Sequence, residues 1–330
     1  MKEQKALLII NPVSGTRSKQ GLAHLVEEKL TFYGIKVVPK ITKGSGDAFQ
    51  MADNAARDGF DMVISAGGDG TVNEIANALS HSGLPMGIIP LGSGNGFARS
   101  LAIPQDVGEA LKIIGEGKTI NCDRGLVNDS PFYCTFGIGL DAAVSEKFAH
   151  VKKRGRVTYI RNVIREFLNY RSQPYAISAD GKVLTEKALL IAVCNAQQYG
   201  NNAYIAPKAK LSDGLLDITI VHSGSPLVTM RMGVELMTGY IDKDTRIDSI
   251  QVKSAVITRL EAGPVHLDGE PRTMGRRMDI KCDPGALKVF APENPPEFRP
   301  MVSPLRAMID DVRYDMMARF QALELLKNIK

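Results

Sequence analysis

Long apolar runs and paired cysteines are both missing from this sequence of 330 residues. The first apolar run, residues 6–10, has only five residues, which predicts a buried strand and neither a signal peptide nor a membrane span. The four cysteines form no CxxC pair and lack the spacing of metal ligands: Cys122, Cys134, Cys194 and Cys282. Without a secretion signal, we expect them to be reduced thiols in the core of a cytoplasmic protein.

Basic charge is concentrated in one segment. Residues 147–171 contain eight Lys or Arg and a single acid, Glu166, so the segment carries a net charge of +7, whereas the whole chain carries +5. Apolar residues recur at helical spacing between Val157 and Leu168. The segment is either a solvated helix face or a docking patch for an anionic membrane surface, and the sequence leaves both open.

The first third of the chain alternates short apolar runs with segments of helical periodicity. The apolar runs are residues 6–10, 37–41, 62–66 and 86–90, and the helical segments are residues 21–30, 48–57 and 72–79. This alternation predicts right-handed crossovers and a parallel sheet. We therefore expect an α/β domain over residues 1–120, with ligands bound at the carboxyl ends of its strands.

Residues 121–292 have a different pattern, in which β-rich segments are bounded by turn residues. The segments are residues 132–136, 175–179, 188–194, 215–221, 251–260, 278–280 and 287–290. They predict an antiparallel β-sandwich that is interrupted by the basic helix near residues 157–170. Over residues 293–330 we expect a proline-rich linker and a C-terminal helix that packs back on one of the domains.

Glycine-rich loops follow three strands of the predicted parallel sheet. They are Asn11-Pro12-Val13-Ser14-Gly15, Gly67-Gly68-Asp69-Gly70-Thr71 and Gly92-Ser93-Gly94-Asn95. Glycine lets backbone N–H groups approach a phosphate closely, and the helix that follows adds the positive end of its dipole. An ordinary turn would explain one such loop, but three at one sheet edge predict a phosphate-binding site.

Two further glycine motifs do not fit the chemistry that they suggest. Gly117-Lys118-Thr119 is similar to the end of a Walker loop, but the glycine required five residues before Gly117 is Lys112. Residues 137–142 match a dinucleotide fingerprint after a strand, yet no acid follows about twenty residues later. A tight backbone bend is expected there instead.

The ordered set of motifs resembles the diacylglycerol kinase catalytic-domain family of lipid kinases, which groups bacterial diacylglycerol kinases with sphingosine and ceramide kinases. The resemblance runs from Asn11 to about Pro292 and adds three later motifs, which are Asn121-Cys-Asp123, Lys210-Leu-Ser-Asp213-Gly-Leu215 and Asp268-Gly-Glu270. It implies a phosphofructokinase-like α/β nucleotide-binding domain, a β-sandwich lipid-substrate domain and an active site in the cleft between them. It also implies transfer of the terminal phosphate of ATP, with Mg²⁺, to the hydroxyl of a lipid alcohol.

The resemblance implies roles for particular residues. Glu270 matches the proton acceptor proposed for bacterial members, Asp69 matches the residue that sphingosine kinases are thought to use for that task, and Asp123 would sit near the accepting hydroxyl. Asp213 and the backbone carbonyls of Lys210 and Leu215 match a structural magnesium site, an oxygen-only set that suits a hard cation. Plain turns remain the alternative at Asp213 and Glu270. The nucleotide would be held by Asn11, Pro12, Val13, Ser14, Gly15, Thr42, Gly67, Gly68, Asp69, Gly70, Thr71 and Ser93.

The sequence departs from the family pattern at two positions. Bacterial diacylglycerol kinases usually have an acid after the Asn of the third loop, where this chain has Gly96. Some members have a lysine directly after the first loop, where this chain has Thr16. These departures leave the identity of the lipid open but not the reaction class.

Two other functions remain as alternatives. A nicotinamide-nucleotide kinase would account for residues 67–71, but not for residues 11–15 or the basic segment. A non-catalytic regulator that binds lipid or nucleotide would not need the four acids that are present, Asp69, Asp123, Asp213 and Glu270. The partners that we expect are a lipid alcohol and an anionic membrane surface, on which the protein is peripheral. No nucleic-acid partner is expected, and homodimer formation stays open.

Overall fold

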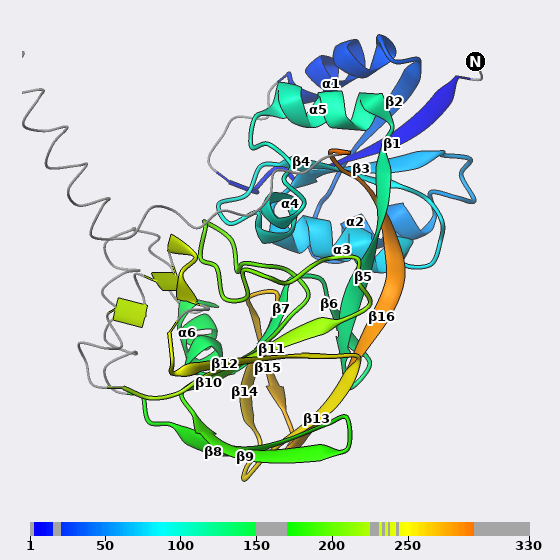
Figure 1. Ribbon diagram of the computed structural model, residues 1–330. Coiled ribbons are helices and arrows are strands. Elements are labelled where there is room, and N and C mark those ends of the chain that lie inside the picture. The colour runs from blue at the N-terminus through cyan, green and yellow to red at the C-terminus, as the bar shows by residue number, and fades with distance from the viewer. Residues whose placement is uncertain are drawn as a thin grey trace, which may run out of the picture.

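The computed structural model describes residues 3–15, 21–149, 170–224, 231–232, 235–236, 238–241 and 244–293. The predicted basic helix, the linker beyond Glu293 and the predicted C-terminal helix lie outside these residues. Two lobes are visible in Figure 1, the first coloured blue to teal and the second mostly green to orange. None of the helices in the described part of the chain combines the length and the apolar character that crossing a bilayer requires.

The N-terminal lobe is an α/β domain, as the sequence predicts. Strands β2, β1, β3 and β4 pair in parallel in that order. The elements are β1 (Gln4–Ile10), α1 (Leu22–Thr31), β2 (Ile35–Ile41), α2 (Asp47–Asp53), β3 (Met62–Gly67), α3 (Asp69–Leu79), β4 (Met86–Pro90), α4 (Gly96–Ser100) and α5 (Val107–Glu116).

Helices cover both faces of this parallel sheet. Alternate residues of β1 point to opposite faces, so Leu7 and Ile9 pack with α2 and α3, whereas Leu8 packs with α1 and α5. Burial on both faces explains why β1, β3 and β4 are nearly continuous apolar runs. The covered faces leave the carboxyl ends of the strands as the place where loops can form a site.

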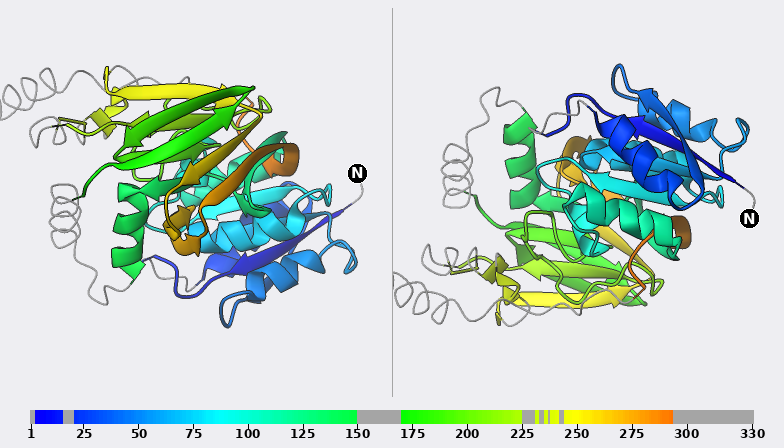
Figure 2. Two further views of the ribbon diagram at one scale, coloured as in Figure 1. Left: turned by 90° about the horizontal axis from the view of Figure 1, so that it is seen from below. Right: turned by 90° about the horizontal axis from the view of Figure 1, so that it is seen from above.

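The second lobe is an antiparallel β-sandwich, which confirms the predicted fold class (Figure 2). One layer is a six-stranded sheet in the order β12-β11-β10-β7-β14-β15, and β13, β8 and β9 belong to the other layer. Phe136 and Ile138 of β7 pack between the layers against Ile177 and Ile257 of the other layer. The elements are β5 (Thr119–Val127), β6 (Ser130–Phe132), β7 (Thr135–Gly139), α6 (Leu140–Ala149), β8 (Gln173–Ala179), β9 (Lys182–Ala188), β10 (Leu190–Cys194), β11 (Leu216–Val221), β12 (Ile247–Val252), β13 (Ser254–Arg259), β14 (Gly263–Leu267), β15 (Glu270–Met274) and β16 (Arg277–Phe290).

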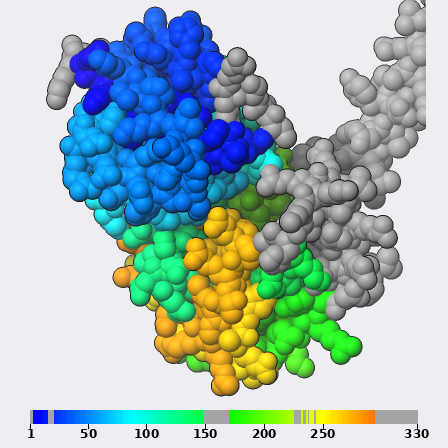
Figure 3. Space-filling model, turned by 180° about the vertical axis from the view of Figure 1, so that it is seen from behind, coloured from blue at the N-terminus to red at the C-terminus, as the bar shows by residue number. Residues whose placement is uncertain are grey.

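Strand β16 joins the two lobes into one ten-stranded sheet. Its first half pairs with β13 of the sandwich, and Val289 near its end pairs in parallel with Met86 of β4. Strand β5 runs antiparallel beside it, with a register shift between Asp283 and Leu287. Figure 1 shows β5 and β16 side by side between the lobes, and Figure 3 shows the lobes in contact from behind. The predicted segments 278–280 and 287–290 are thus one bulged strand.

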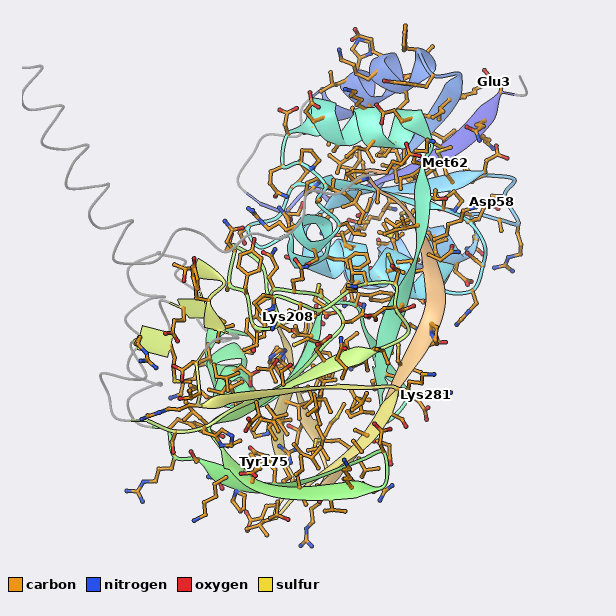
Figure 4. All side chains as sticks on the ribbon, viewed as in Figure 1. Glu3, Asp58, Met62, Tyr175, Lys208 and Lys281 are labelled. Atoms are coloured by element: carbon orange, nitrogen blue, oxygen red, sulfur yellow. The ribbon has the colours of Figure 1, made fainter. Side chains whose placement is uncertain are left out.

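The two lobes also share a hydrophobic core. Leu211 and Tyr133 of the second part of the chain belong to the same buried cluster as Leu7 and Ile75 of the first. In Figure 4, Met62 and Tyr175 mark the two lobes, and Lys208 lies in the part of the second lobe near the first. The shared core fixes where the loops of one domain meet the turns of the other.

Candidate active site

The three glycine loops converge at the carboxyl edge of the parallel sheet. A Cβ atom at Gly68 would lie 3.2 Å from the Cα atom of Gly92, so the second and third loops are in backbone contact. A Cβ atom at Gly15, whose φ is 64°, would overlap the carbonyl oxygen of Leu91, so the first loop also abuts the third. Only glycine permits this approach, and the backbone amides are therefore gathered in one place.

Asp69 links the second loop to the third. Its Oδ2 accepts a hydrogen bond from the backbone N–H of Asn95 at 2.8 Å, and its Oδ1 accepts one from Gly96 at 2.7 Å. Asp69 is the first residue of α3, where the helix dipole favours a negative charge. The sequence indicates a carboxylate with little packing to do, and the structure shows that it also fixes a loop.

Asn95 closes the third loop. Its φ is 52° and its side chain is buried, with Oδ1 accepting from the N–H of Gly92 at 3.0 Å and Nδ2 donating to the carbonyl of Gly92 at 2.9 Å. Asn tolerates the left-handed conformation better than most residues with a side chain. The motif contains Asn95, but its spacing does not indicate this role.

The remaining predicted nucleotide residues lie at the same edge. Asn11 Nδ2 donates to Thr71 Oγ1 at 2.9 Å, and Asn11 Oδ1 accepts from the N–H of Val13 at 3.0 Å. Thr42 is buried at the end of β2, where its N–H donates to the carbonyl of Ile10 at 2.9 Å. Pro12, Val13 and Ser93 are exposed at the tips of the loops.

Glu74 holds the loop that follows Thr42, a role that the sequence does not reveal. Its carboxylate, on α3, accepts from the N–H groups of Gly46 at 2.9 Å and Ala48 at 3.1 Å. These amides belong to the N-terminal end of α2 and have no partner within that helix. The two ends of the interaction are far apart in sequence, so no local pattern could indicate it.

Asp268 connects the second domain to α3. Its Oδ1 accepts from the backbone N–H groups of Cys134 at 2.7 Å and Thr135 at 2.9 Å. Its Oδ2 accepts from the N–H of Tyr133 at 2.8 Å and from Asn73 Nδ2 at 2.7 Å. Burial raises the pKa of this carboxyl group, and the backbone hydrogen bonds oppose that rise. Asn73 follows the second glycine loop by two residues, so Asp268 fixes its own turn against that loop.

Glu270 reaches the second glycine loop from the other domain. It is the exposed first residue of β15, directly after the turn that Asp268 anchors. Its Oε1 lies 3.6 Å from the position that a Cβ atom at Gly70 would occupy. Gly70 is next to Asp69, so the structure brings the two predicted candidates for the base to the same loop.

Asp123 is placed differently from the other two predicted catalytic acids. It is buried, and its carboxylate accepts from the N–H groups of Gly214 at 2.6 Å and Gly285 at 2.8 Å. Its own N–H donates to the carbonyl of Leu211 at 2.6 Å. Asp123 thus fixes residues 211–214 and the bulge of β16, and its proximity to an accepting hydroxyl remains a prediction.

The predicted magnesium ligands lie around Asp213, just before β11. Asp213 is exposed, and its Oδ1 accepts from the N–H of Leu215 at 3.1 Å. Burial raises the pKa of the nearby Asp217 carboxyl, the hydrogen bond from Gln251 opposes that rise, and the charge of Asp213 adds to it. The described residues hold no cluster of three or more His, Cys, Asp or Glu side chains suited to a metal. A site here would depend instead on Asp213 and the carbonyls of Lys210 and Leu215, and it remains a prediction.

Gly96 has no room for a side chain. A Cβ atom there would lie 2.9 Å from the carbonyl oxygen of Tyr199 and 3.3 Å from the nitrogen of Gly200. The N–H of Asn201 also donates to the carbonyl of Gly94 at 3.3 Å. A backbone segment of the second domain therefore fills the space beside the third loop, at the position where the family usually has an acid.

Gly96→Ala should destabilise the protein. We expect the free energy of unfolding to fall by about 1–3 kcal/mol, because the added methyl group must displace Tyr199 from the third loop. Gly275→Ala is the matched control, since a Cβ atom at Gly275 would have no heavy atom within 4 Å. Urea unfolding of both variants measures the difference, and equal stability of the two would show that the Tyr199 contact is not tight.

Comparison with known proteins agrees with this geometry. Residues 5–127 match the model of the diacylglycerol kinase catalytic domain, and residues 135–291 match the YegS C-terminal NAD kinase beta sandwich-like domain. The chain is 28% identical over 300 residues to the diacylglycerol kinase of Mycobacterium tuberculosis, which covers 88% of this chain and 96% of that protein. It is 30% identical over 266 residues to a chain from Chromohalobacter salexigens named "probable lipid kinase YegS-like", with coverage of 79% and 85%.

A solved structure has the same arrangement of domains. A Bacillus anthracis protein assigned to the diacylglycerol kinases superimposes with a TM-score of 0.74 at 29% identity, over 89% of this chain and 99% of that protein. The likeness therefore extends over both domains and not only over the glycine loops. From the ordered motifs, the two domain matches and this shared architecture, the chain belongs to the diacylglycerol kinase family of lipid kinases, and it is a kinase.

Proposed function

We propose that this kinase transfers the γ-phosphate of ATP to the hydroxyl of a lipid alcohol such as diacylglycerol or a sphingoid base. The observation that carries the proposal is the approach of Glu270 to Gly70, with the carboxylate oxygen 3.6 Å from the position of a Cβ atom there. A carboxylate from the sandwich domain thus meets a phosphate-binding loop of the α/β domain. An acceptor hydroxyl between them would have a phosphate on one side and a base on the other.

The glycine loops supply the electrostatic part of the reaction. Phosphoryl transfer needs in-line placement and neutralisation of charge on the transferred group, and it needs little covalent help. Backbone amides of residues 11–15 and 67–71 would hold the phosphates, with Thr42 and Ser93 at the rim of the same edge. Mg²⁺, when bound, supplies positive charge to the phosphates, and Asp213 with the carbonyls of Lys210 and Leu215 would hold a structural Mg²⁺.

Glu270 is the residue that we assign as the base. It would take the proton from the acceptor hydroxyl as the bond to phosphorus forms. Its carboxylate is exposed and has no hydrogen-bond partner among the described residues, so it is available to a substrate. Asp69 is a weaker candidate because both of its carboxylate oxygens already accept backbone N–H groups.

The proposal is tested with γ-labelled ATP and a panel of acceptors. Diacylglycerol, a sphingoid base, NAD and a no-acceptor control would be offered separately in detergent micelles with Mg²⁺. We expect label to enter a lipid alcohol and not NAD. Label in NAD alone would support a nicotinamide-nucleotide kinase, and no transfer to any acceptor would support a non-catalytic regulator.

The basic segment, residues 147–171, lies mostly outside the described residues, and we propose that it docks the protein on anionic membrane. An expected contribution of about 1 kcal/mol for each basic residue near the surface makes its charge of +7 sufficient for peripheral binding. Sedimentation with liposomes should show binding that rises with the anionic lipid fraction and weakens with salt. Binding that responds to neither would exclude this electrostatic mechanism.

A further inference from the structure

A polar cluster around the buried His266 in the second domain has no part in the reaction described above. It consists of Asp141 on α6, Tyr199 after β10 and His266 on β14. His266 Nε2 lies 3.1 Å from Asp141 Oδ2, and the hydroxyl of Tyr199 donates to the same oxygen at 3.1 Å. The rings of Tyr199 and His266 meet edge to face, with their centroids 5.9 Å apart. Polar groups held in a protein interior need such partners, so the cluster is a unit.

The hydrogen bonds define the tautomer of His266. The backbone N–H of Gly269 donates to His266 Nδ1 at 3.3 Å, so Nδ1 is an acceptor. The proton of the neutral ring is then on Nε2, which donates it to Asp141. Asp141 therefore sets both the orientation and the tautomer of the ring that receives the Gly269 amide.

This interaction ends at the turn that carries the proposed base. Gly269 stands between Asp268 and Glu270, with a φ of 83°. Asp268 is fixed by backbone amides and Asn73, and the amide of Gly269 is fixed by His266. With both preceding residues held, the backbone position from which Glu270 extends toward Gly70 is determined.

The other end of the cluster lies against the third glycine loop. The hydroxyl of Tyr199 donates a hydrogen bond to Asp141. The backbone carbonyl oxygen of Tyr199 lies 2.9 Å from the position that a Cβ atom at Gly96 would occupy. A side chain at Gly137 would overlap both Asp141 and His266, so glycine is needed at that position for the cluster to form. The cluster thus connects the third loop to the turn of Glu270 within the second domain.

We propose that Asp141, Tyr199 and His266 form a positioning unit that sets the place of the Glu270 carboxylate relative to the glycine loops. The inference rests on the proposed role of Glu270 as the base. None of the three residues touches the reacting groups, so each acts through the Gly269–Glu270 backbone. The competing explanation is that the cluster only stabilises the sandwich.

Two substitutions at His266 distinguish the positioning role from a purely stabilising role. Each of them replaces the hydrogen-bonding function of one ring nitrogen and removes that of the other. His266→Asn keeps an acceptor near the Nδ1 position for Gly269, and His266→Gln keeps a donor near the Nε2 position for Asp141. We expect kcat for phosphorylation of a short-chain diacylglycerol to fall by about 10- to 100-fold in the Gln variant, the scale of a small misplacement of a reacting group. The Asn variant should retain more activity, and KM for ATP should be nearly unchanged in both. Equal kcat in the two variants, or losses that follow their melting temperatures, would overturn the proposal.

A double variant and a milder variant complete the test. If His266 acts through Glu270, adding His266→Gln to Glu270→Gln should cause no further loss of kcat, whereas additive losses would contradict the proposal. Tyr199→Phe keeps the ring and removes only the hydroxyl, so it remains informative if the His266 variants fold poorly, and unchanged kcat in it would remove Tyr199 from the unit. An active Glu270→Gln single variant would instead overturn the assignment of the base, which distinguishes failure of the proposed function from failure of this inference.

Discussion

Glu270→Gln should lower lipid phosphorylation by about 10²- to 10⁴-fold while ATP affinity stays close to that of the unaltered protein. Gln preserves the size and most of the hydrogen-bonding capacity of the side chain, but it cannot accept the proton of the acceptor hydroxyl. The Glu270 side chain is exposed and makes no hydrogen bond among the described residues, so the fold should not depend on its charge. Kinetics with γ-labelled ATP, together with ATP binding by calorimetry, would separate the two effects.

Glu261→Gln is the matched control for this prediction. Glu261 is also exposed and lies in the same domain, before β14 instead of after it. The Glu261→Gln variant should retain full kinase activity. If Glu270→Gln loses ATP affinity together with turnover, then Glu270 is a nucleotide or metal contact, and the role of base passes to Asp69.

Asp69→Asn should lower turnover by about 10²-fold or more, the scale of losing a catalytic electrostatic group. The structure adds a second expectation. The side chain of Asn has one acceptor oxygen and one NH₂ group, whereas Asp69 has two acceptor oxygens. The backbone N–H of either Asn95 or Gly96 would therefore lose its acceptor and face the NH₂ group. Leaving one buried donor unpaired costs about 1–3 kcal/mol, so the melting temperature should fall as well.

Asp106→Asn is a suitable control for the Asp69 variant. Asp106 caps α5 by accepting from the N–H of Glu109 at 3.1 Å, and Asn serves equally well at such a cap. Activity and thermal unfolding should both remain normal in this control. A fully active Asp69→Asn enzyme would remove Asp69 from the site, whatever its stability.

The α/β domain could be read from the sequence because its pattern is local. Burial on both faces makes β1, β3 and β4 nearly continuous apolar runs, and α3 repeats apolar residues at positions 72, 75, 76 and 79. The Walker-like motif at residues 117–119 also has a local explanation. Gly117 is the residue that ends α5, and its φ of 73° lies in the left-handed region that glycine favours.

The strands of the β-sandwich were harder to predict from the sequence, because several of them lack a continuous apolar run. Strand β9 is an edge strand whose residues are mostly exposed, and β15 has a single large apolar residue, Met274. The predicted run over residues 251–260 is in fact two strands, since Lys253 separates β12 from β13 and the two belong to different sheets. Only the tertiary arrangement decides such breaks.

Most residues of the candidate site are part of the sequence motifs, but their contacts could not be predicted from those motifs. Asp268 bonds Asn73 across 195 positions of the sequence, and Glu74 holds amides 26 and 28 positions away. Asp141 lies within the fingerprint-like residues 137–142 but has no predicted role there, and His266 belongs to no motif. A sequence pattern reveals spacing within one element, whereas these roles arise from packing between elements.

Phosphoryl transfer to a lipid is tested most directly by measuring which phosphate of ATP enters the extracted lipid. The protein would be incubated with diacylglycerol in mixed micelles and Mg²⁺, once with γ-labelled ATP and once with α-labelled ATP, and the lipid would then be extracted. We expect label in the extracted lipid from γ-labelled ATP only, and we expect it to be lost in the Glu270→Gln variant. γ-Label that stays in the aqueous phase as ATP or inorganic phosphate would contradict phosphoryl transfer to diacylglycerol.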